Sequence, residues 1–464
     1  MGRDRKRHGS HESREARVGP ERDHESREVF VLSTAGIKTE TRSNYTTPDR
    51  PTWELYSRCI HCGLCLQQCP TYRVLGREAD SPRGRIYQIL QVDAGRLTID
   101  ESFVTHLDRC LGCRACETAC PSGVSYGRIL ERARAEIEQN YKRPWLDRKL
   151  REHFYGSVLH DFKKLARYAK WVGFYQRSGL QAVLRATGLL KLFGVAELDA
   201  LSPKIESDFY FREFGNVYAA VGERRGRVAL LAGCIASVAF AELNRATVRV
   251  LTKNGIEVVV PKEQTCCGAL HAHAGQLPKA RELAKKNIDA MMAPGVDAVI
   301  SNAAGCGCML KEYGELLEHD PEYSVKAADF AARVRDVNEY LYEVGLRAPA
   351  RKLASRVTYQ DPCHLAHGQK VRSAPRELMK AIGIEVVEMP RADDCCGSAG
   401  TYNIVQNELS MKILDEKMAN VASVKPEIIA TANVGCMLQL KAGEKRARLN
   451  AEVVHVVELL DRAF

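Results

Sequence analysis

Two stretches of the chain repeat one cysteine spacing at every position, and this spacing limits the possible folds more than any other feature. They are "CIHCGLCLQQCP" and "CLGCRACETACP", with cysteines at Cys59, Cys62, Cys65 and Cys69 and at Cys110, Cys113, Cys116 and Cys120. Both stretches read C-x2-C-x2-C-x3-C-P, the spacing of bacterial cubane iron–sulfur sites, in which the fourth cysteine ligates the other cluster. Three thiolates on a tight loop converge on three iron corners, and a distant segment supplies the fourth. We therefore predict two [4Fe–4S] clusters.

The rule of the distant fourth cysteine assigns one ligand set to each cluster. The first set is Cys59, Cys62, Cys65 and Cys120, and the second set is Cys110, Cys113, Cys116 and Cys69. Zinc, which prefers paired C-x2-C knuckles, and free core cysteines are the alternatives. Helix-like stretches between the motifs, such as "RGRIYQILQVDAG", favour an α-helical ferredoxin-type domain over 51–144. The flanking Arg58, Arg109 and Arg114 either raise the cluster potentials or are ordinary solvated charges.

The distribution of all 17 cysteines over 464 residues indicates metal ligands or redox thiols in a reducing compartment. They fall in three groups, within 59–120, 234–308 and 363–436, unlike the spread of a disulfide scaffold. No secretion signal is visible, and the longest apolar run, 14 residues, is shorter than the roughly 18 that span a membrane. We therefore expect a cytoplasmic protein. The net charge of +10 is spread out, without a dense basic patch that would predict nucleic-acid binding.

The second and third cysteine groups form an internal repeat. Cys234, the pair Cys266–Cys267 and Cys306 recur about 129 residues later as Cys363, the pair Cys395–Cys396 and Cys436. Each cysteine follows a short β-branched apolar run, and helical stretches separate these runs, so we predict two α/β units with mostly parallel sheets, over 227–350 and 351–464. Ligands gather beyond the carboxyl ends of such strands. The cysteines of each copy should therefore meet at one sheet edge.

Several other residues have two readings. Four histidines could complete a metal shell or simply bond to the loop backbone: His271, His273, His364 and His367. Cys308 occurs in one copy only and is read as an ordinary buried cysteine. Residues 1–50 are expected to form a disordered polar tail, and 145–226 a helical connector. Part of that connector is basic and amphipathic, which is compatible with a membrane surface or with packing on protein.

The repeated cysteine pair followed by glycine, "CCG", resembles the cysteine-rich domain of heterodisulfide reductases and of several iron–sulfur subunits. These belong to glycolate oxidase, lactate-utilisation and anaerobic glycerol-3-phosphate dehydrogenase complexes. Two cubane motifs followed by two such domains, over roughly 50–464, resemble the glycolate oxidase iron–sulfur subunit. The resemblance implies an α+β multidomain fold. One departure is that a fifth cysteine of the reductase pattern is replaced by Met309 and Gln439. Whether the CCG domains bind a further iron–sulfur centre or carry only thiols therefore stays open.

The resemblance also implies a function. No dinucleotide-binding, P-loop or Ser/His/Asp motif is present, so no catalytic residue is expected in this chain. The chain would relay electrons from an FAD-linked oxidase subunit that oxidises glycolate or D-lactate to a quinone or other acceptor. Peripheral association with the cytoplasmic face of the inner membrane is compatible with this role. The alternatives are the corresponding subunit of a lactate-utilisation or glycerol-3-phosphate dehydrogenase complex, and a disulfide reductase.

Overall fold

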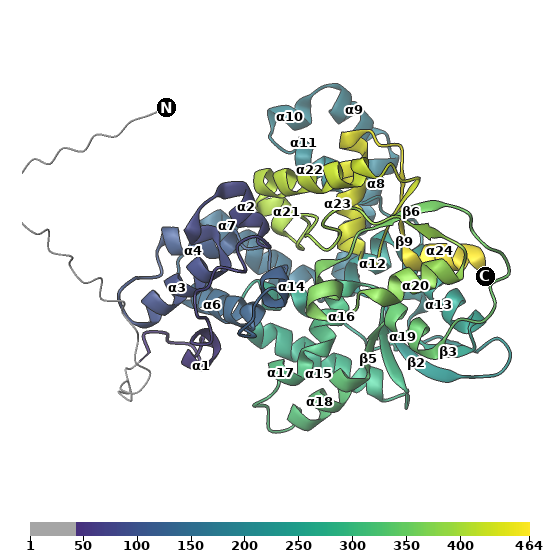
Figure 1. Cartoon of the computed structure of the whole chain (residues 1–464), viewed down its shortest axis with the longest axis horizontal. Coiled ribbons are helices and arrows are strands. Elements are labelled where there is room, and N and C mark those ends of the chain that lie inside the picture. Colours follow the sequence, from purple (N-terminus) through teal and green to yellow (C-terminus); the bar gives the residue numbers. More distant parts are fainter. Residues whose placement is uncertain (1–42) are drawn as a thin grey trace, which may run out of the picture. The chain divides into compact units, whose positions relative to one another are not determined.

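The computed structural model describes residues 43–464 (Figure 1), so residues 1–42 of the tail expected over 1–50 lie outside the described residues. The segment with both cubane motifs is helical wherever it is regular, as predicted. Its elements are α1 (Trp53–Tyr56), α2 (Pro70–Leu75), the 3-10 turn η1 (Glu78–Asp80), α3 (Pro82–Asp93), α4 (Glu101–Asp108), α5 (Ala115–Thr118) and α6 (Tyr126–Asn140). Asp100 caps the start of α4, and its carboxylate accepts a hydrogen bond from the Phe103 amide.

Residues 43–50 differ from the disordered tail predicted over 1–50, because they pack on the helical segment. Tyr45 is buried, and its hydroxyl donates to the Ile89 carbonyl oxygen over 2.8 Å. The Thr47 amide donates to the Glu136 carboxylate, also over 2.8 Å. These partners are about 40 to 90 residues away along the chain. A local composition of polar residues therefore could not reveal that this segment is ordered.

The connector is a series of helices. They are α7 (Trp145–His153), the π-helical turn η2 (Phe154–Val158), α8 (Phe162–Arg177), α9 (Leu180–Ala186), α10 (Leu189–Leu192) and α11 (Ala196–Leu201). Gly179 and Gly188 have φ angles of 82° and 72°, which L side chains rarely adopt, and they separate α8, α9 and α10. The basic amphipathic stretch is therefore one helix of 16 residues followed by two short ones. Within residues 43–464, we find no helix with the length and apolarity needed to cross a bilayer.

The first copy of the repeat is built on a five-stranded sheet in the order β1-β3-β2-β4-β5. The strands are β1 (Val217–Tyr218), β2 (Gly226–Leu231), β3 (Ile256–Val259), β4 (Ala298–Ser301) and β5 (Val334–Asp336), and all pairings are parallel except that of β1. Its helical elements are η3 (Tyr210–Glu213), α12 (Cys234–Ala239), α13 (Ala241–Lys253), α14 (Ala269–His273), α15 (Leu277–Met292), α16 (Ala304–Lys311), α17 (Tyr313–Leu316), α18 (Ser324–Arg333) and α19 (Val337–Val344).

The second copy has a four-stranded parallel sheet in the order β7-β6-β8-β9. The strands are β6 (Arg356–Tyr359), β7 (Glu385–Val386), β8 (Ile428–Thr431) and β9 (Glu452–His455). Its helical elements are the π-helical turn η4 (His364–Gly368), α20 (Ser373–Ala381), α21 (Tyr402–Val405), α22 (Asn407–Ser423), α23 (Val434–Ala447) and α24 (Val456–Ala463). The helical segment followed by two α/β copies confirms the predicted α+β fold.

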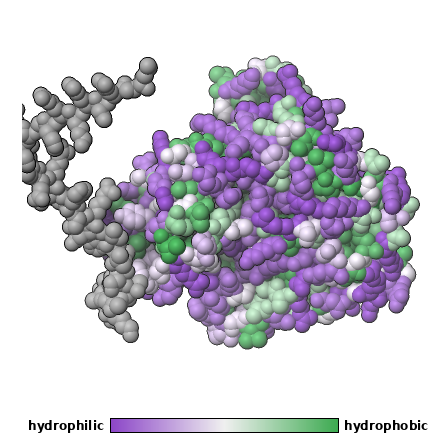
Figure 2. All heavy atoms as spheres, viewed as in Figure 1, coloured by the Kyte–Doolittle hydropathy of each residue, from purple (hydrophilic) through white to green (hydrophobic). Residues whose placement is uncertain are grey.

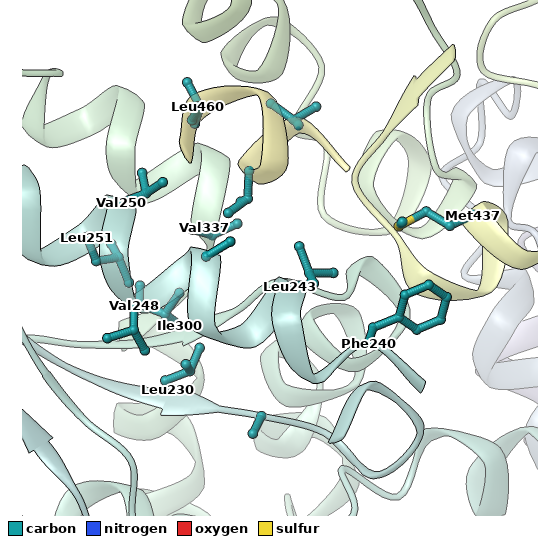
Figure 3. Close-up of a cluster of buried hydrophobic side chains, with 14 of the residues drawn as sticks. Leu230, Phe240, Leu243, Val248, Val250, Leu251, Ile300, Val337, Met437 and Leu460 are labelled. Carbon is teal, nitrogen blue, oxygen red and sulfur yellow. The ribbon is translucent and has the colours of Figure 1, made fainter. Parts of the chain in front are cut away.

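The two copies share one hydrophobic core. Helix α13 of the first copy packs on α24 of the second, and Figure 3 shows Leu243 and Val250 on one side of this contact and Leu460 on the other. The Arg249 guanidinium on α13 also pairs with the Asp461 carboxylate over 2.6 Å. Fusion of the two sheets through apolar helix faces fixes the cysteine groups of both copies in one rigid body.

The last strand of each copy ends at a buried residue that caps the next helix, and these two residues should give opposite pH dependences. Burial raises the pKa of Asp336 to about 7 and lowers that of His455 to about 4. The stability that depends on Asp336 is therefore complete below its unfolded pKa and is lost as pH rises through 7. The stability that depends on His455 is lost as pH falls from its unfolded pKa towards 4.

We expect Asp336→Asn, which keeps the capping oxygen, to raise the melting temperature relative to the wild type at pH 8 but not at pH 4. The difference in the free energy of unfolding should grow by about 1.4 kcal/mol per pH unit between 3.8, the ordinary pKa of an aspartate, and about 7, and should level off above that. His455→Asn is the matched control and should gain only at acid pH. Calorimetric melting of both variants from pH 4 to 8 measures this, and parallel curves for the wild type and Asp336→Asn would contradict it.

Candidate metal centres

The two cubane motif loops have the same backbone conformation around their second cysteine. His61 and Gly63 flank Cys62 with φ angles of 55° and 85°, and Gly112 and Arg114 flank Cys113 with φ angles of 65° and 63°. Left-handed residues at such positions turn successive backbone N–H groups towards one side, forming a concave nest that binds anions, including iron–sulfur clusters. The Gly112 amide, for example, donates to the Cys110 sulfur over 3.4 Å. The shared spacing therefore has a shared local structure.

The first cubane set (Cys59, Cys62, Cys65 and Cys120) lies at the surface. Burial, followed by the nearby Cys120 and Cys62 thiols, raises the pKa of Cys59. The Cys120 thiol of the second motif therefore lies beside the thiols of the first, as the crossed assignment requires. Cys62 is exposed and the other three are half-buried. This group of thiols is accessible to a partner.

The second cubane set (Cys69, Cys110, Cys113 and Cys116) is buried. Burial, followed by the Cys113, Cys110 and Cys69 thiols, raises the pKa of Cys116. All four cysteines line one cavity, together with Pro70, Thr71, Pro82, Arg85, Leu111, Arg114 and Tyr126. Cys69 thus lies with three cysteines of the second motif and also near Cys65 of its own, and its ligation of the second cluster stays a prediction.

Arg85 is a functional residue of this cavity that the cysteine spacing does not predict. Its side chain is fully buried, its Nε donates to the His106 carbonyl oxygen over 2.7 Å, and its Nη2 donates to the Thr71 hydroxyl over 3.2 Å. Its Nη1 has no hydrogen-bond partner within residues 43–464. A buried guanidinium with a spare donor beside four thiols fits an anionic group in the cavity. No local signal distinguishes Arg85 from Arg83, the half-buried arginine of the same helix.

The residues of both sets fit iron–sulfur clusters. Within residues 43–464, no three Cys, His, Asp or Glu side chains are placed as around a single metal ion. In a [4Fe–4S] cluster each iron takes one cysteine thiolate. The four thiols therefore need to enclose a space for the cluster and need not converge on one point. For the second set, this space is the cavity with its spare arginine donor, and the backbone nests of both loops suit the negative charge of a cluster.

The flanking arginines named in the sequence analysis have three different environments. Arg58 is exposed, as expected for a solvated charge. Arg109 pairs with the buried Asp80 carboxylate over 3.4 Å. Arg114 is mostly buried, donates to the Cys308 sulfur over 3.2 Å and pairs with Glu312. Cys308, which is buried as predicted, therefore contacts the helical segment.

The first repeat site (Cys234, Cys266, Cys267 and Cys306) gathers its thiols in a row at one edge of the sheet. Cys234 and Cys266, Cys266 and Cys267, and Cys267 and Cys306 are close enough that in each pair one thiol shifts the pKa of the other. Gly268 has a φ angle of 83°, and its amide donates to the Cys266 sulfur over 3.5 Å. The convergence predicted from the strand ends is therefore present.

The second repeat site (Cys363, Cys395, Cys396 and Cys436) has the same row of thiols. A Cβ on Gly397 would lie 2.6 Å from the Ser410 carbonyl oxygen, so only glycine fits after this cysteine pair. Gln439, which replaces the fifth cysteine, is buried, and its side-chain NH2 donates to the Ser410 hydroxyl over 3.0 Å. Its amide thus takes part in the local hydrogen bonding of the fold.

Polar side chains contact the thiols of the second repeat site, and within residues 43–464 we find no such side-chain contact at the first. The His364 Nδ1 lies 3.5 Å from the Cys363 sulfur, and the Asn433 side-chain NH2 donates to the Cys436 sulfur over 3.3 Å. A hydrogen bond from Cys395, followed by the His364 ring, holds the pKa of Cys363 well below its ordinary value. The corresponding positions in the first copy are Ile235 and Ala303. The second site is therefore better suited to thiolate charge.

The other three histidines have partners of their own. His271 Nε2 lies 2.9 Å from the Tyr155 carbonyl oxygen, which fits the backbone-bonded alternative. His273 Nδ1 lies 2.8 Å from the Glu131 carboxylate, and His367 Nε2 lies 3.0 Å from the Asp393 carbonyl oxygen. Among these four histidines, we find contact with a repeat-site thiol only for His364 in the described part of the chain.

The second cubane set lies next to the second repeat site. Burial, followed by the nearby Cys363 thiol, raises the pKa of Cys113. Cys113 and Cys395 also belong to one apolar cluster with Leu111 and Tyr402. The Tyr402 hydroxyl donates to the Arg109 carbonyl oxygen over 3.0 Å, which fixes the contact. From the surface inward, the order of the thiol sites is therefore the first cubane set, the second cubane set and the second repeat site.

Known protein families match most of the chain. The 4Fe-4S dicluster domain matches residues 55–124, and the cysteine-rich domain matches 228–311 and 357–441. The model described as "Glycolate oxidase iron-sulfur subunit, linker region" matches 146–202. These matches cover both cubane motifs, both copies of the repeat and most of the connector.

Similar proteins are known over most of the chain's length. The probable glycolate oxidase iron-sulfur subunit of Bacillus subtilis is 43% identical, covering 87% of this chain and 92% of its own. The glycolate oxidase iron-sulfur subunit of Escherichia coli is 36% identical, with 88% and 93% covered. Lactate utilization protein A of Oceanobacillus iheyensis is 32% identical, covering 51% of this chain and 96% of its own. This chain therefore belongs to the family of glycolate oxidase iron–sulfur subunits.

Proposed function

We propose that this chain is the electron-transfer subunit of a complex that oxidises glycolate or D-lactate, and that its two cubane sets are the ligands of two [4Fe–4S] clusters. Bound clusters of this kind accept and release single electrons. The crossed gathering of the eight motif cysteines carries the proposal, since this is the pairing that a two-cluster site needs. The family to which the chain belongs supports the reaction class.

The chain's own residues would set the order of the centres. The first cubane set is accessible at Cys62, whereas Cys69 and the rest of the second set are enclosed by protein. The second set adjoins Cys363 of the second repeat site, which we propose as the place of a further iron–sulfur centre. His364 and Asn433 would stabilise thiolate charge there. The first repeat site lacks these groups.

Oxidation of a 2-hydroxy acid requires a hydride acceptor, which we place on a partner. The sequence has no dinucleotide-binding motif. A flavin accepts a hydride and releases electrons singly, so an FAD-linked partner subunit would couple the substrate to this chain. We further propose a quinone or similar acceptor and a cytoplasmic site of action. The domain limits predicted from the sequence, at 144, 226 and 350, remain part of this proposal.

Co-purification with the flavoprotein partner tests this function. The complex should reduce an artificial dye when given glycolate or D-lactate, and the partner alone should do so much more slowly. Comparison of the two substrates with glycerol 3-phosphate separates the alternative complexes. A complex that holds iron and reduces disulfides, but shows no dye reduction with either hydroxy acid, would overturn the proposal.

We expect the flavoprotein partner to dock at the first cubane set. Ile60 and Leu64 flank the exposed Cys62 and are themselves 69% and 59% exposed. Ile60→Glu together with Leu64→Glu should lower partner-dependent dye reduction about ten-fold or more, because desolvating new charges in an interface costs several kcal/mol. Iron content should not change. Val325→Glu, at an exposed apolar position on α18, is the control, and equal activities of all three proteins would contradict this docking site.

A further inference from the structure

Helices α8, α9 and α10 carry an unusual concentration of exposed apolar side chains. Of the 24 large apolar residues exposed within 43–464, ten lie between 168 and 195. Helices α9 and α10, "LQAVLRA" and "LLKL", bury none of their residues. Trp171, Leu192 and Phe193 are 68%, 77% and 74% exposed. Such an apolar surface marks an interaction site, because a single-chain protein rarely exposes so much of it in one place.

The same surface has charge of one sign. Residues 162–195 contain seven lysines and arginines and no aspartate or glutamate. Arg185 pairs with Asp199, but Arg167, Lys170 and Lys191 have no carboxylate partner within the described residues 43–464. Figure 2 shows apolar and polar residues side by side over the tip formed by α9 and α10. Whatever binds here must accept both apolar groups and positive charge.

Helix α8 shows how the apolar and basic groups are arranged. Leu165, Ala169 and Gly173, spaced four residues apart, form the buried face. Trp171 and Phe174, three residues apart, lie on the exposed face. Lys170 directly precedes Trp171 in the chain and is also exposed. The helix therefore has a second apolar stripe, mixed with basic residues, that the fold itself does not use.

We propose that the exposed side chains of residues 162–195, called the linker surface below, bind the interface of a membrane that contains anionic lipids. Interfacial helices combine lysine and arginine with tryptophan, phenylalanine and leucine in this way. An anionic leaflet attracts each basic residue, and the aromatic and leucine side chains enter the headgroup region. This inference goes beyond the electron-transfer function and does not depend on the substrate.

A protein partner fits the linker surface less well than a membrane does. Lysine is depleted in protein–protein interfaces, where its strongly hydrated ammonium group is costly to bury. Four of the seven basic residues here are lysines: Lys163, Lys164, Lys170 and Lys191. At a membrane surface, long lysine side chains keep their charge among the headgroups while their stems lie along apolar groups. The lysine content therefore favours lipid.

Co-sedimentation of the full reconstituted chain with vesicles tests this surface. We expect binding to vesicles of phosphatidylcholine with phosphatidylglycerol, weakening at high salt, and much less binding to phosphatidylcholine alone. Lys191→Glu with Phe193→Ser should weaken binding to the anionic vesicles about ten-fold or more, because loss of one basic residue alone costs about five-fold. Both residues are exposed, so the fold should tolerate the change.

A matched double variant on α18 controls for general effects of charge and polarity. Val325→Ser with Lys326→Glu makes the same kinds of change at exposed positions outside the linker surface, and should bind vesicles as the wild type does. Iron content, melting temperature and partner-dependent dye reduction without vesicles should be unchanged in both variants. Failure of the dye assay in the wild type would count against the proposed function alone.

Three results would overturn the membrane proposal. One is equal binding of the wild type to both kinds of vesicle, or to neither. Another is unchanged vesicle binding by Lys191→Glu with Phe193→Ser. The third is loss of the flavoprotein partner by that variant while vesicle binding persists, which would identify the linker surface as a protein interface.

Discussion

Cys69→Ala should remove the buried cluster and leave the exposed one, whereas Cys120→Ala should do the reverse. The reason is the crossing of the fourth thiols: Cys69 lies with Cys113 and Cys116, and Cys120 lies with Cys59. Each single variant should lose about half of the cubane iron. Because both lose the same amount, iron counts of the single variants cannot show which ligand serves which cluster.

Double variants settle the ligand sets. In a Cys59→Ala background, in which the exposed cluster is already lost, Cys120→Ala should remove no further iron, and Cys69→Ala should remove the rest of the cubane iron. Ligation within each motif predicts the opposite pairing. Anaerobic reconstitution followed by iron and sulfide determination measures both. Cys308→Ala is the control, since this buried thiol belongs to neither set, and it should keep the iron content of the wild type.

The cysteine spacing predicts much of the site because the local motif determines the local backbone. Left-handed residues on both sides of Cys62 and Cys113 follow from a loop that must bring three thiols together within seven residues. The repeat predicts the rows of thiols for a related reason, since parallel strands place their carboxyl ends at one edge. In each case a regular feature, a tight loop or the edge of a parallel sheet, fixes where the cysteines lie.

Contacts between distant segments could not be predicted from the sequence. Cys113 and Cys363 lie together because the helical segment packs on the second copy, where Arg73 of α2 pairs with Glu416 of α22 over 2.8 Å. Burial of Tyr45 also depends on distant partners, which is why the polar sequence around it predicts a tail. No periodicity or spacing encodes which surfaces of separate units match.

The environment of the histidines is a further example. The adjacency of Cys363 and His364 in the sequence indicated a possible ligand pair, and the structure brings the ring to the thiol. The same composition argument applied to His271, which instead bonds to the Tyr155 backbone of the connector. The position of η2 beside α14 decides this difference. Sequence alone names the candidates, and tertiary packing selects among them.

Arg85 offers the second large effect, on the reduction potential of the buried cluster. Its side chain is fully buried beside Cys69 and Cys110. Burial opposes its charge, but those sulfurs and Asp80 outweigh burial and raise the pKa of Arg85 above its ordinary value. Reduction adds a negative charge to the cluster, so a fixed positive charge nearby favours the reduced form.

Arg85→Gln should therefore lower the potential of the buried cluster. A unit charge several ångströms away contributes about 2 kcal/mol at an effective dielectric constant of about 20. For one electron this corresponds to a shift on the order of 100 mV. The potential of the exposed cluster should change much less, and so should both potentials in Arg58→Gln, because Arg58 is exposed to water. Redox titration followed by electron paramagnetic resonance measures both clusters.

Arg85→Lys separates charge from structure. Lysine keeps the positive charge but cannot reproduce the hydrogen bonds that Arg85 makes to both His106 and Thr71. If charge sets the potential, Arg85→Lys should stay within a few tens of millivolts of the wild type, on the scale of about 59 mV for a tenfold change in a one-electron equilibrium. If hydrogen bonding and packing set the potential, Arg85→Lys and Arg85→Gln should shift the potential of the buried cluster by the same amount. Equal shifts would therefore refute the electrostatic role of Arg85, even if the cluster still assembles in both variants.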